Sequence, residues 1–144
     1  MQNDTLQFGT KPEGEYKNRP CAYVIVVNQD KKLLTLKVGQ TFHLPGGGID
    51  ADEDPKVAAI RETQEEAGCE ITDLQYLGTA NQFLLKTKLG PLNKFGMFYR
   101  ARLVRIDPSK KTEPTHEVHW LEPDEFINLP AAEFQKWAVK KSLE

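Results

Sequence analysis

Runs of apolar residues, separated by polar turns and glycines, divide the chain into predicted strands and helices. The run CAYVIVVN (Cys21–Asn28) is rich in β-branched residues and predicts a buried strand. KKLLTLKV follows it after a polar Asn-Gln-Asp turn, so we expect the two runs to form a hairpin. Other strand-like runs lie at residues 41–45, 70–80, 81–88, 95–104 and 117–122.

One helix is marked by capping residues at both ends. Asp54 followed by Pro55 is a typical N-cap and first helical residue, and Gly68 is a typical C-terminal stop. The sequence therefore predicts a helix over residues 55–67. We expect its core-facing stripe to comprise Val57, Ile60, Thr63 or Gln64, and Ala67, with Ala58 and Ala59 allowing close packing.

The end of the chain has the pattern of two closing helices, DEFINL and AAEFQKWAVKKSL. The apolar stripe of the second consists of Phe134, Trp137, Ala138 and Leu143. The glycines at 46–48 predict a loop. Strands on both sides of one early helix, with helices at the end, predict a mixed α/β sandwich. We expect one domain over residues 1–144, in which residues 1–20 form an N-terminal extension or an extra strand.

The composition is that of an ordinary globular domain. The chain has 144 residues, of which 39% are hydrophobic and 28% are charged. Cys21 and Cys69 give no disulfide framework and are typical of a reducing compartment. The N-terminus has no secretory signal pattern, and no apolar run approaches the roughly 18 residues of a membrane helix. We therefore expect a cytoplasmic protein without a membrane partner, and a pI near 6.0 argues against nucleic-acid binding.

The acidic residues are concentrated in one segment. Residues 46–70 contain eight acids and two bases, a net charge of −6, whereas the whole chain carries −2, so the remainder carries +4. An acidic block within a mildly basic frame suits a cation in the block and an anionic ligand nearby. The alternative is a solvated acidic face.

Three glutamates lie near the C-terminal end of the predicted helix. Glu62 precedes Glu65 and Glu66 by three and four residues, a spacing at which like charges cost roughly 0.2–0.5 kcal/mol per pair. Acids at this end of a helix cost about another 0.3–1 kcal/mol each. Carboxylates are ligands suited to Mg²⁺ or Mn²⁺, which would reverse the repulsion. Because the preceding glycines let phosphates and a backbone carbonyl approach a metal, the residues favour a metal-dependent enzyme acting on phosphate chains.

The segment GGIDADEDPKVAAIRETQEEAGC (Gly47–Cys69) resembles the Nudix box. That motif runs Gly, five residues, Glu, seven residues, Arg-Glu, an aliphatic residue, one residue, Glu-Glu, one residue, Gly and a final aliphatic residue. The matching positions are Gly47, Glu53, Arg61, Glu62, Glu65, Glu66 and Gly68. Thr63 stands where a bulky aliphatic residue is usual, and Cys69 replaces the final one. Both positions have packing roles, so we expect the chemistry of the motif to be intact.

The resemblance implies a metal site and a catalytic group. Glu62, Glu65 and Glu66 would bind divalent cations, Mg²⁺ or Mn²⁺, and the backbone carbonyl of Gly46 would join them. One of these glutamates, with Glu65 and Glu62 as the candidates, would help to deprotonate the attacking water. The metals would polarise the diphosphate and neutralise charge on the leaving phosphate.

The resemblance also implies supporting residues. Arg61 and Glu53 would pair and hold the catalytic helix against its loop. A further acid from a distant loop often serves as ligand or base, and Glu117 and Glu113 are the candidates.

The residue types suggest substrate contacts. These contacts are expected at Gly47, Gly48, Lys37, Phe83 and Tyr99. Phe42 is another ring that could stack a base, and Lys94 and Arg100 are other cations that could meet phosphate.

The implied fold is the Nudix α/β/α sandwich with a mixed central sheet. The implied reaction is hydrolysis of a phosphoanhydride bond in a nucleoside diphosphate linked to another moiety, such as a nucleotide sugar. A MutT-like nucleoside triphosphate pyrophosphatase is the alternative, capped RNA 5′ ends are conceivable substrates, and a nucleotide-binding regulatory module is the non-enzymatic alternative. Homodimers are frequent in the family. The proline of ADP-ribose hydrolases and the tyrosine of diadenosine polyphosphate hydrolases are replaced here by Leu84 or Leu85 and by Thr87.

Two competing metal-binding motifs lack residues that they require. Asp50–Asp54 resembles the start of an EF-hand loop, but Pro55 stands where that loop needs Gly and Arg61 where it needs Glu. His116 and His119 have no further ligands at the spacing of a structural zinc site. Residues three apart on a strand also point to opposite faces. Neither motif changes the hypothesis of a Nudix metal site.

Overall fold

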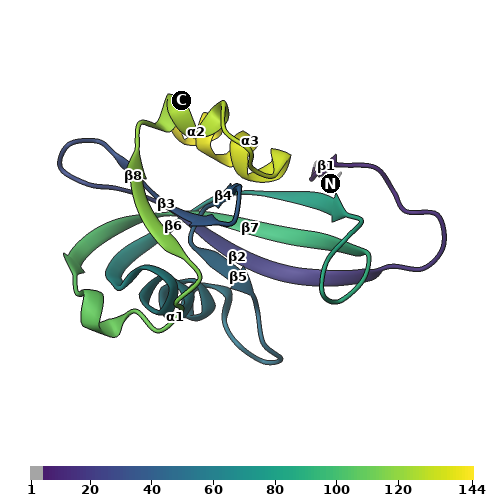
Figure 1. The fold of residues 1–144 in the computed structure, drawn as a ribbon, viewed down its shortest axis with the longest axis horizontal. Coiled ribbons are helices and arrows are strands. Elements are labelled where there is room, and N and C mark those ends of the chain that lie inside the picture. The colour runs from purple at the N-terminus through teal and green to yellow at the C-terminus, as the bar shows by residue number, and fades with distance from the viewer. Residues whose placement is uncertain (1–4) are drawn as a thin grey trace.

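The structure is a computed structural model that describes residues 5–144. Its strands, drawn in Figure 1, are β1 (Leu6–Phe8), β2 (Lys17–Val27), β3 (Leu33–Val38), β4 (Thr41–His43), β5 (Gly46–Gly48), β6 (Cys69–Leu84), β7 (Leu92–Ile106) and β8 (Glu117–Leu121). Its helices are α1 (Pro55–Ala67), α2 (Pro123–Ile127) and α3 (Glu133–Ser142), with a 3₁₀ turn η1 (Pro108–Lys110). Within the described range, none of the helices combines the length and apolar character that a membrane crossing requires.

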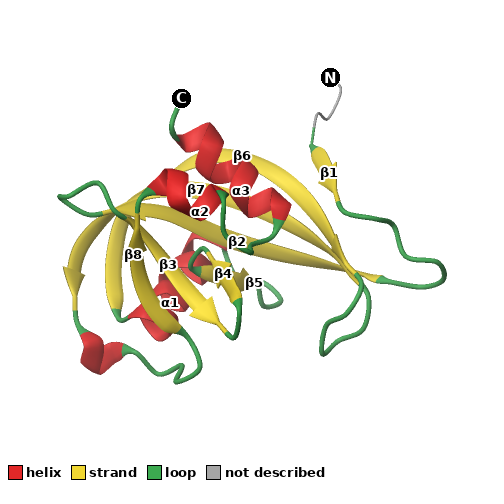
Figure 2. Ribbon diagram, turned by 45° about the horizontal axis from the view of Figure 1, so that its top comes forward, coloured by secondary structure: helices red, strands yellow, loops and turns green. Residues whose placement is uncertain are grey.

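A mixed sheet organises these elements. Its strand order is β1-β6-β7-β2-β3-β4, with β5 added beside β2 and β8 beside β3. The β2–β7 and β1–β6 pairs are parallel, and the remaining pairs are antiparallel. Helix α1 covers one face of the sheet, and α2 and α3 lie on the other (Figures 1 and 2). The predicted mixed α/β sandwich is confirmed.

Strand β2 supplies both cores because its side chains alternate between the two faces of the sheet. One core, on the α1 face, contains Ala22, Val24, Val26, Ala59 and Ala67. The other core, on the α3 face, contains Tyr23, Ile25, Phe98, Phe134 and Val139. The run predicted from Cys21 is therefore a buried strand, although β2 begins earlier, at Lys17.

Helix α1 has the predicted ends. The Asp54 carboxylate accepts hydrogen bonds from the backbone N–H groups of Lys56, at 2.8 Å, and Val57, at 3.4 Å. Gly68 adopts a left-handed conformation with φ of 66° and donates its N–H to the Gln64 carbonyl at 2.9 Å. Both caps supply hydrogen-bond partners for backbone groups that have none within the helix.

The predicted core stripe of α1 is partly wrong. Val57 and Ile60 are 55% and 37% exposed, respectively. The buried residues are Ala58, Ala59, Thr63, Glu66 and Ala67. Small side chains let the helix approach the sheet closely, and the Thr63 hydroxyl donates to the Ala59 carbonyl at 2.7 Å instead of to water. This rotation of the helix also turns Glu66 inward.

The glycines at 46–48 form a strand, so the loop predicted there is wrong. β5 pairs with β2 in the register Tyr23–Gly46, Ala22–Gly47 and Cys21–Gly48. Gly46 has φ of 138°, and a Cβ there would overlap the Ala22 carbonyl oxygen and lie 2.8 Å from the Tyr23 Cα. Glycine is needed for this close backbone approach, and the absence of side chains hid the strand from the sequence pattern.

The runs predicted at 70–80 and 81–88 are one long strand, β6, with irregular register at three places. At Gly78 a Cβ would lie 2.9 Å from the Trp137 ring, so this glycine lets α3 pack closely on β6. The buried Gln82 side chain accepts a hydrogen bond from the Phe134 N–H at 3.1 Å and caps the start of α3. The stripe predicted on α3 is wrong at Leu143, which follows the helix and is 52% exposed.

The N-terminal segment contributes β1, which pairs with β6 in parallel. Its Gln7 side chain exchanges two hydrogen bonds with the buried Asn93, at 2.9 and 3.1 Å. Residues 1–4 of the segment lie outside the described part of the chain.

Candidate active site

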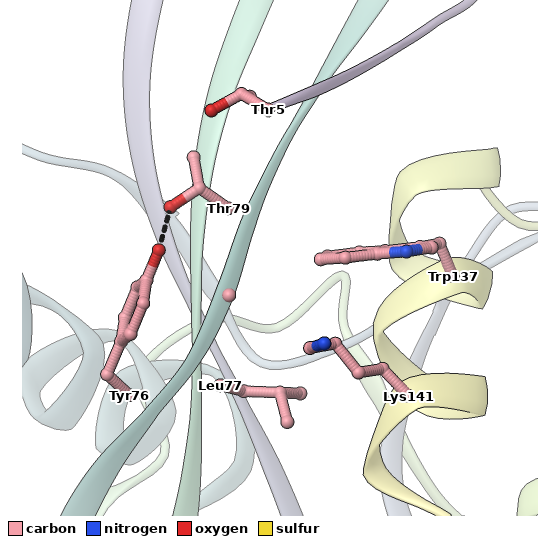
Figure 3. A pocket seen from close by; sticks show the side chains of 7 residues that line it. Thr5, Tyr76, Leu77, Thr79, Trp137 and Lys141 are labelled. Atoms are coloured by element: carbon pink, nitrogen blue, oxygen red, sulfur yellow. Dashed lines mark hydrogen bonds between the residues drawn. The ribbon is translucent and has the colours of Figure 1, made fainter. Parts of the chain in front are cut away.

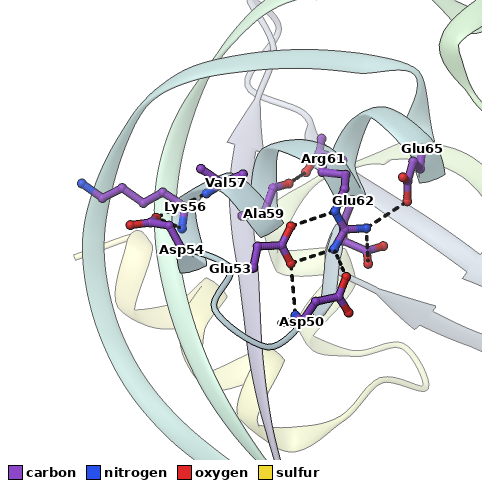
Figure 4. Close-up of polar contacts among 10 residues, drawn as sticks. Asp50, Glu53, Asp54, Lys56, Val57, Ala59, Arg61, Glu62 and Glu65 are labelled. Atoms are coloured by element: carbon purple, nitrogen blue, oxygen red, sulfur yellow. Dashed lines mark hydrogen bonds and ion pairs between the residues drawn. The ribbon is translucent and has the colours of Figure 1, made fainter.

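Arg61 ties the loop before α1 to the helix (Figure 4). Its Nε and Nη2 donate to the two Glu53 carboxylate oxygens at 2.9 and 3.0 Å. The Asp50 N–H also donates to Glu53, at 3.1 Å. These donors, Arg61 above all, hold the pKa of Glu53 below its ordinary value. The structure thus brings together the pair that the sequence predicts.

The same guanidinium also reaches the acids of the helix (Figure 4). Arg61 Nη1 lies 3.3 Å from Glu62 Oε1 and 3.3 Å from Glu65 Oε1. The hydrogen bonds to Glu53, and then these neighbouring carboxylates, raise the pKa of Arg61. Because one cation is shared among several carboxylates, the helix end keeps an excess of negative charge.

Glu66 is the buried member of the three glutamates, with 8% of its surface exposed. Its Oε1 accepts the Gly46 N–H at 2.9 Å, and its Oε2 lies 3.4 Å from His116 Nε2. Burial, followed by repulsion from Glu62 and other acids, raises the pKa of Glu66 to about 8, and the Gly46 N–H only partly counters this. A carboxylate kept in such a place is costly unless a cation joins it.

Glu62 stands against the same glycine strand. A Cβ on Gly47 would lie 3.4 Å from the Glu62 carboxyl carbon, so the absent side chain leaves room for that carboxylate. Burial raises the pKa of Glu62, and Arg61 partly reverses the effect. Glu62 and Glu66 therefore face successive residues of β5, Gly47 and Gly46.

The segment after η1 brings one of the two expected acids near the cluster. The N–H groups of Thr112 and Glu113 both donate to the Glu65 carbonyl, at 2.9 and 3.0 Å, which holds this segment on the end of α1. Glu113 lies near Glu66, with His116 between them, 3.8 Å from the Glu113 carboxylate. Glu117 instead faces His119 at 3.3 Å and stays exposed.

A cleft of about 270 Å³ opens beside Glu66. It is lined by Tyr23, Val38, His43, Leu44, Gly46, Gly47, Glu66, Lys94, His116 and Gln135. These residues come from β2, β3, β4, β5, β7, α1, α3 and the segment before β8. The sheet divides here, because β2 pairs with β5 at residues 21–23 and with β3 only at Val27–Leu33, nearer its C-terminal end.

Several expected substrate contacts lie elsewhere. The Lys37 ammonium lies 5.7 Å from the centre of the Phe42 ring, outside the cleft lining. Phe83 and Tyr99 are only 9% and 6% exposed and pack against Tyr16 and Tyr76, respectively. Neither ring offers a free face to a nucleobase. Arg100 donates to the Ser142 carbonyl at 2.9 Å.

The sequence pattern missed His43, His116, Tyr23 and Gln135 as cleft residues. Burial, followed by the charge of Lys94, lowers the pKa of His43 to about 4, so its ring is neutral near pH 7. The Gln135 side chain accepts the Leu44 N–H at 2.7 Å and fixes that wall of the cleft. No motif signalled these residues, because they meet only through pairing between distant strands.

The α1 carboxylates fit a hard divalent cation by their chemistry. Three oxygen donors lie within one helical turn, and the buried one has a raised pKa. In residues 5–144 no three His, Cys, Asp or Glu side chains already converge on one point. Glu62 and Glu65 are instead turned to Arg61, and a bound cation would compete with that guanidinium.

A second hollow lies on the α3 face, at the irregular part of β6. Figure 3 shows Trp137 and Lys141 projecting from α3 toward it, with Tyr76 hydrogen-bonded to Thr79. Its volume is about 290 Å³, and no carboxylate from residues 5–144 lines it. We therefore place the candidate active site at the Glu66 cleft.

Comparison with known proteins identifies the chain. A family model described as the NUDIX domain matches residues 17–143. The chain belongs to the Nudix family. The resemblance drawn from the box is confirmed over most of the chain, because the match includes both the β5–α1 unit and the strands that build the cleft.

Curated relatives of this Nudix chain carry different names. Nudix hydrolase 26, chloroplastic, of Arabidopsis thaliana is 42% identical over 40% of this chain and 26% of its own length. An RNA pyrophosphohydrolase of Hydrogenovibrio crunogenus is 35% identical over 46% and 41% of the two chains. A MutT-like protein of Streptomyces ambofaciens is 31% identical over 70% and 62%. The chain thus spans about a quarter to two fifths of the first two relatives' lengths.

Solved structures show the same Nudix fold. A NUDIX hydrolase from Nitrosomonas europaea has a TM-score of 0.73 at 16% identity and covers 88% of each chain. A MutT NUDIX hydrolase from Burkholderia pseudomallei has a TM-score of 0.69 at 21% identity and covers 86% of this chain and 97% of that one. At these identities the likeness concerns the fold.

Proposed function

We propose that this Nudix chain hydrolyses a phosphoanhydride bond in a nucleoside diphosphate linked to another moiety, with Mg²⁺ or Mn²⁺ as cofactor. The observation that carries the proposal is the buried Glu66 carboxylate, hydrogen-bonded to the Gly46 N–H beside a cleft that also holds Lys94. This arrangement places oxygen ligands for a cation beside a basic residue and a backbone without side chains, as a phosphate chain requires.

The residues that would hold the cation are Glu62, Glu65 and Glu66, with the Gly46 carbonyl as a further oxygen. Such a cation supplies Lewis-acid polarisation of the phosphate oxygens and lowers the pKa of bound water. The protein holds these ligands in place through Arg61, whose bidentate contact with Glu53 joins the loop to α1. Glu113, on the segment bonded to the end of α1, is the better placed of the two further acids.

Glu65 is our candidate for accepting the proton of the attacking water. Its side chain is 43% exposed, against 21% for Glu62 and 11% for Glu66, so water reaches it most easily. The contact with Arg61 Nη1, at 3.3 Å, holds this carboxylate in position, and a positioned carboxylate can act as a general base. Glu62 and Glu66, more enclosed and facing β5, are better suited to ligation.

A nucleoside triphosphate, or an RNA 5′ end, is the second candidate substrate. Relatives named RNA pyrophosphohydrolase and MutT-like protein favour it. A regulatory module that binds nucleotides without turnover is the non-enzymatic alternative. We also propose that the protein works in the cytoplasm, with a small-molecule nucleotide as substrate and no membrane partner, and that it forms a homodimer.

A substrate panel with product identification tests the proposal. The protein is incubated with Mg²⁺ or Mn²⁺ and nucleotide sugars, dinucleotides, nucleoside triphosphates or 5′-triphosphate RNA. Release of a nucleoside monophosphate and a sugar phosphate supports the first candidate, and release of pyrophosphate supports the second. Tight binding without turnover across the panel would contradict the enzymatic proposal and support a regulatory module.

A further inference from the structure

Two cations beside the cleft have no acidic partner. The side chains of Arg19 and Lys94 are half-buried, and among residues 5–144 neither makes an ion pair or a side-chain hydrogen bond. Arg61, Arg102 and Arg105, by contrast, each contact a carboxylate at 2.9 Å. A half-buried charge has lost part of its hydration, so two unpaired cations at a cleft favour an anionic ligand.

The sheet places these cations side by side. Arg19 on β2 and Lys94 on β7 are direct partners in the parallel register. Neighbouring strands lie about 4.8 Å apart and partner residues project from the same face. Lys94 lines the cleft, and the Arg19 guanidinium lies over Gly48, where any Cβ would overlap it. A glycine at position 48 therefore leaves room for the Arg19 guanidinium, whereas the glycine at position 47 leaves room for the Glu62 carboxylate.

The glycine strand separates the two charge types. Glu62 stands on its α1 side and Arg19 on its other side, while the cleft joins Glu66 to Lys94. The buried Cys21 thiol is affected by both types: burial raises its pKa, Lys94 and Arg19 lower it, and Glu62 raises it. The geometry agrees, because Glu66 and Lys94 line one cleft, and Glu62 and Arg19 lie against the neighbouring glycines 47 and 48 of β5.

The lining of the cleft suits phosphate better than a base. Its volume is about 270 Å³, and its one Tyr, Tyr23, is 3% exposed. The Tyr23 ring is therefore not free for stacking, and the His43 ring, which makes no hydrogen bond within the described residues, is available to donate one.

We propose that Arg19 and Lys94 form an anion subsite for a phosphate group of the substrate beyond the two phosphates joined by the scissile bond. This inference rests on the proposed function and narrows it. The moiety linked to the nucleoside diphosphate then carries its own phosphate, either as the terminal phosphate of a triphosphate or as a phosphorylated group. Substrates with an uncharged sugar lack a partner for these cations.

Paired substrates and matched variants test the subsite. Turnover of a nucleoside triphosphate is compared with turnover of a diphosphate sugar of the same nucleoside, in wild type, Lys94→Met, Lys94→Arg and Arg19→Met. We expect Lys94→Met to lower kcat/KM for the triphosphate at least about tenfold, since a hydrogen bond to a charged group contributes that factor or more. The loss on the diphosphate sugar should be at least about threefold smaller than the loss on the triphosphate, and Lys94→Arg should keep most of the activity on both substrates. Equal losses on both substrates, or none on either, would overturn the subsite.

A binding measurement tests the anion subsite independently of turnover. Inorganic tripolyphosphate, without metal, is titrated while the thermal midpoint of unfolding is recorded, because a ligand of the native state raises that midpoint. We expect a rise in wild type that is reduced in Lys94→Met and Arg19→Met and kept in Lys37→Met, whose cation lies over Phe42. A Lys94-dependent rise without turnover would retain the subsite and reject the proposed enzyme. A rise that ignores both cations, beside normal turnover, would reject the subsite alone.

Discussion

The two sides of the glycine strand differ in how their charges are arranged. On the α1 side, Glu53, Glu62 and Glu65 share Arg61, and these residues lie within a short segment of the chain. On the other side, Arg19 and Lys94 come from strands far apart in sequence and have no acidic partner within residues 5–144. On the first side Arg61 neutralises only part of the negative charge, and on the second side no acid neutralises the two cations within residues 5–144. The comparison teaches that, in the proposed function, the local motif would supply the cation site and the sheet would supply the subsite for the substrate.

The largest expected effect comes from removing a carboxylate on the α1 side. We predict that Glu65→Gln lowers turnover by roughly 10²–10⁴ because it removes a proton acceptor and an oxygen ligand. Glu70→Gln is the matched control, since both side chains are 43% exposed and each contacts an arginine. Steady-state kinetics with Mg²⁺ checks the pair. Equal activity of the two variants would show that the charges of the box carry no special role.

The next prediction tests how closely the glycine strand β5 packs on β2. Gly46→Ala should lower the free energy of unfolding by about 3 kcal/mol or more, because the new Cβ would meet the backbone of β2 at a strained φ. Gly39→Ala has positive φ but open space around it, and should cost about 1 kcal/mol. Urea unfolding of both variants gives the difference. Similar costs would mean that β5 does not pack on β2 as described.

The segment from β5 to the end of α1 shows which features the sequence could predict and which it could not. The ends of α1 follow from local capping residues, and the Arg61–Glu53 contact is what the resemblance to the Nudix box implies. The glycine strand was predicted as a loop because glycine carries no pattern, and only pairing with β2 makes it a strand. The outward positions of Val57 and Ile60 were missed for a similar reason, since the packing of α1 on the sheet decides which face is buried.

Lys37 and Lys94 show the same limit for the substrate side. Both are lysines on strands, and nothing in the sequence ranks them as phosphate contacts. The register of β7 on β2 brings Lys94 to the cleft, while Lys37 lies over Phe42. Contacts between distant segments, such as Gln135 with Leu44, complete the wall.

A smaller effect is expected on the α3 side, where side chains support the fold. Gln82→Met leaves the Phe134 N–H without its buried acceptor and should cost about 1–2 kcal/mol. Turnover per folded molecule should stay within twofold or so, as the residue lies outside the cleft lining. Gln75→Met, at an exposed position of the same strand, is the control. A large fall in kcat for Gln82→Met would contradict the expectation that this residue supports the fold and not turnover.

The smallest effect concerns acid stability. Folding lowers the pKa of His43 from 6.5 to about 4, mainly by burial, so its contribution to stability is full above pH 6.5 and is lost as pH falls toward 4. His43→Gln removes this loss. We expect the variant to gain on wild type by on the order of 1 kcal/mol at pH 5, after allowance for partial exposure, and nothing at pH 8. Unfolding free energies at several pH values check this, and a constant difference would contradict it.

The central claim is that the α1 carboxylates form a divalent-cation site used in turnover. The most direct measurement is Mg²⁺ titration by calorimetry of wild type and Glu66→Gln, with turnover followed in the same preparations. We predict that wild type binds Mg²⁺ and requires it, and that Glu66→Gln loses turnover at least about 10²-fold and binds Mg²⁺ at least about tenfold more weakly. The metal-free variant should be folded and at least as stable as wild type, because it removes a buried carboxylate from a group of acids. Unchanged Mg²⁺ affinity and near-normal turnover in Glu66→Gln would contradict the claim.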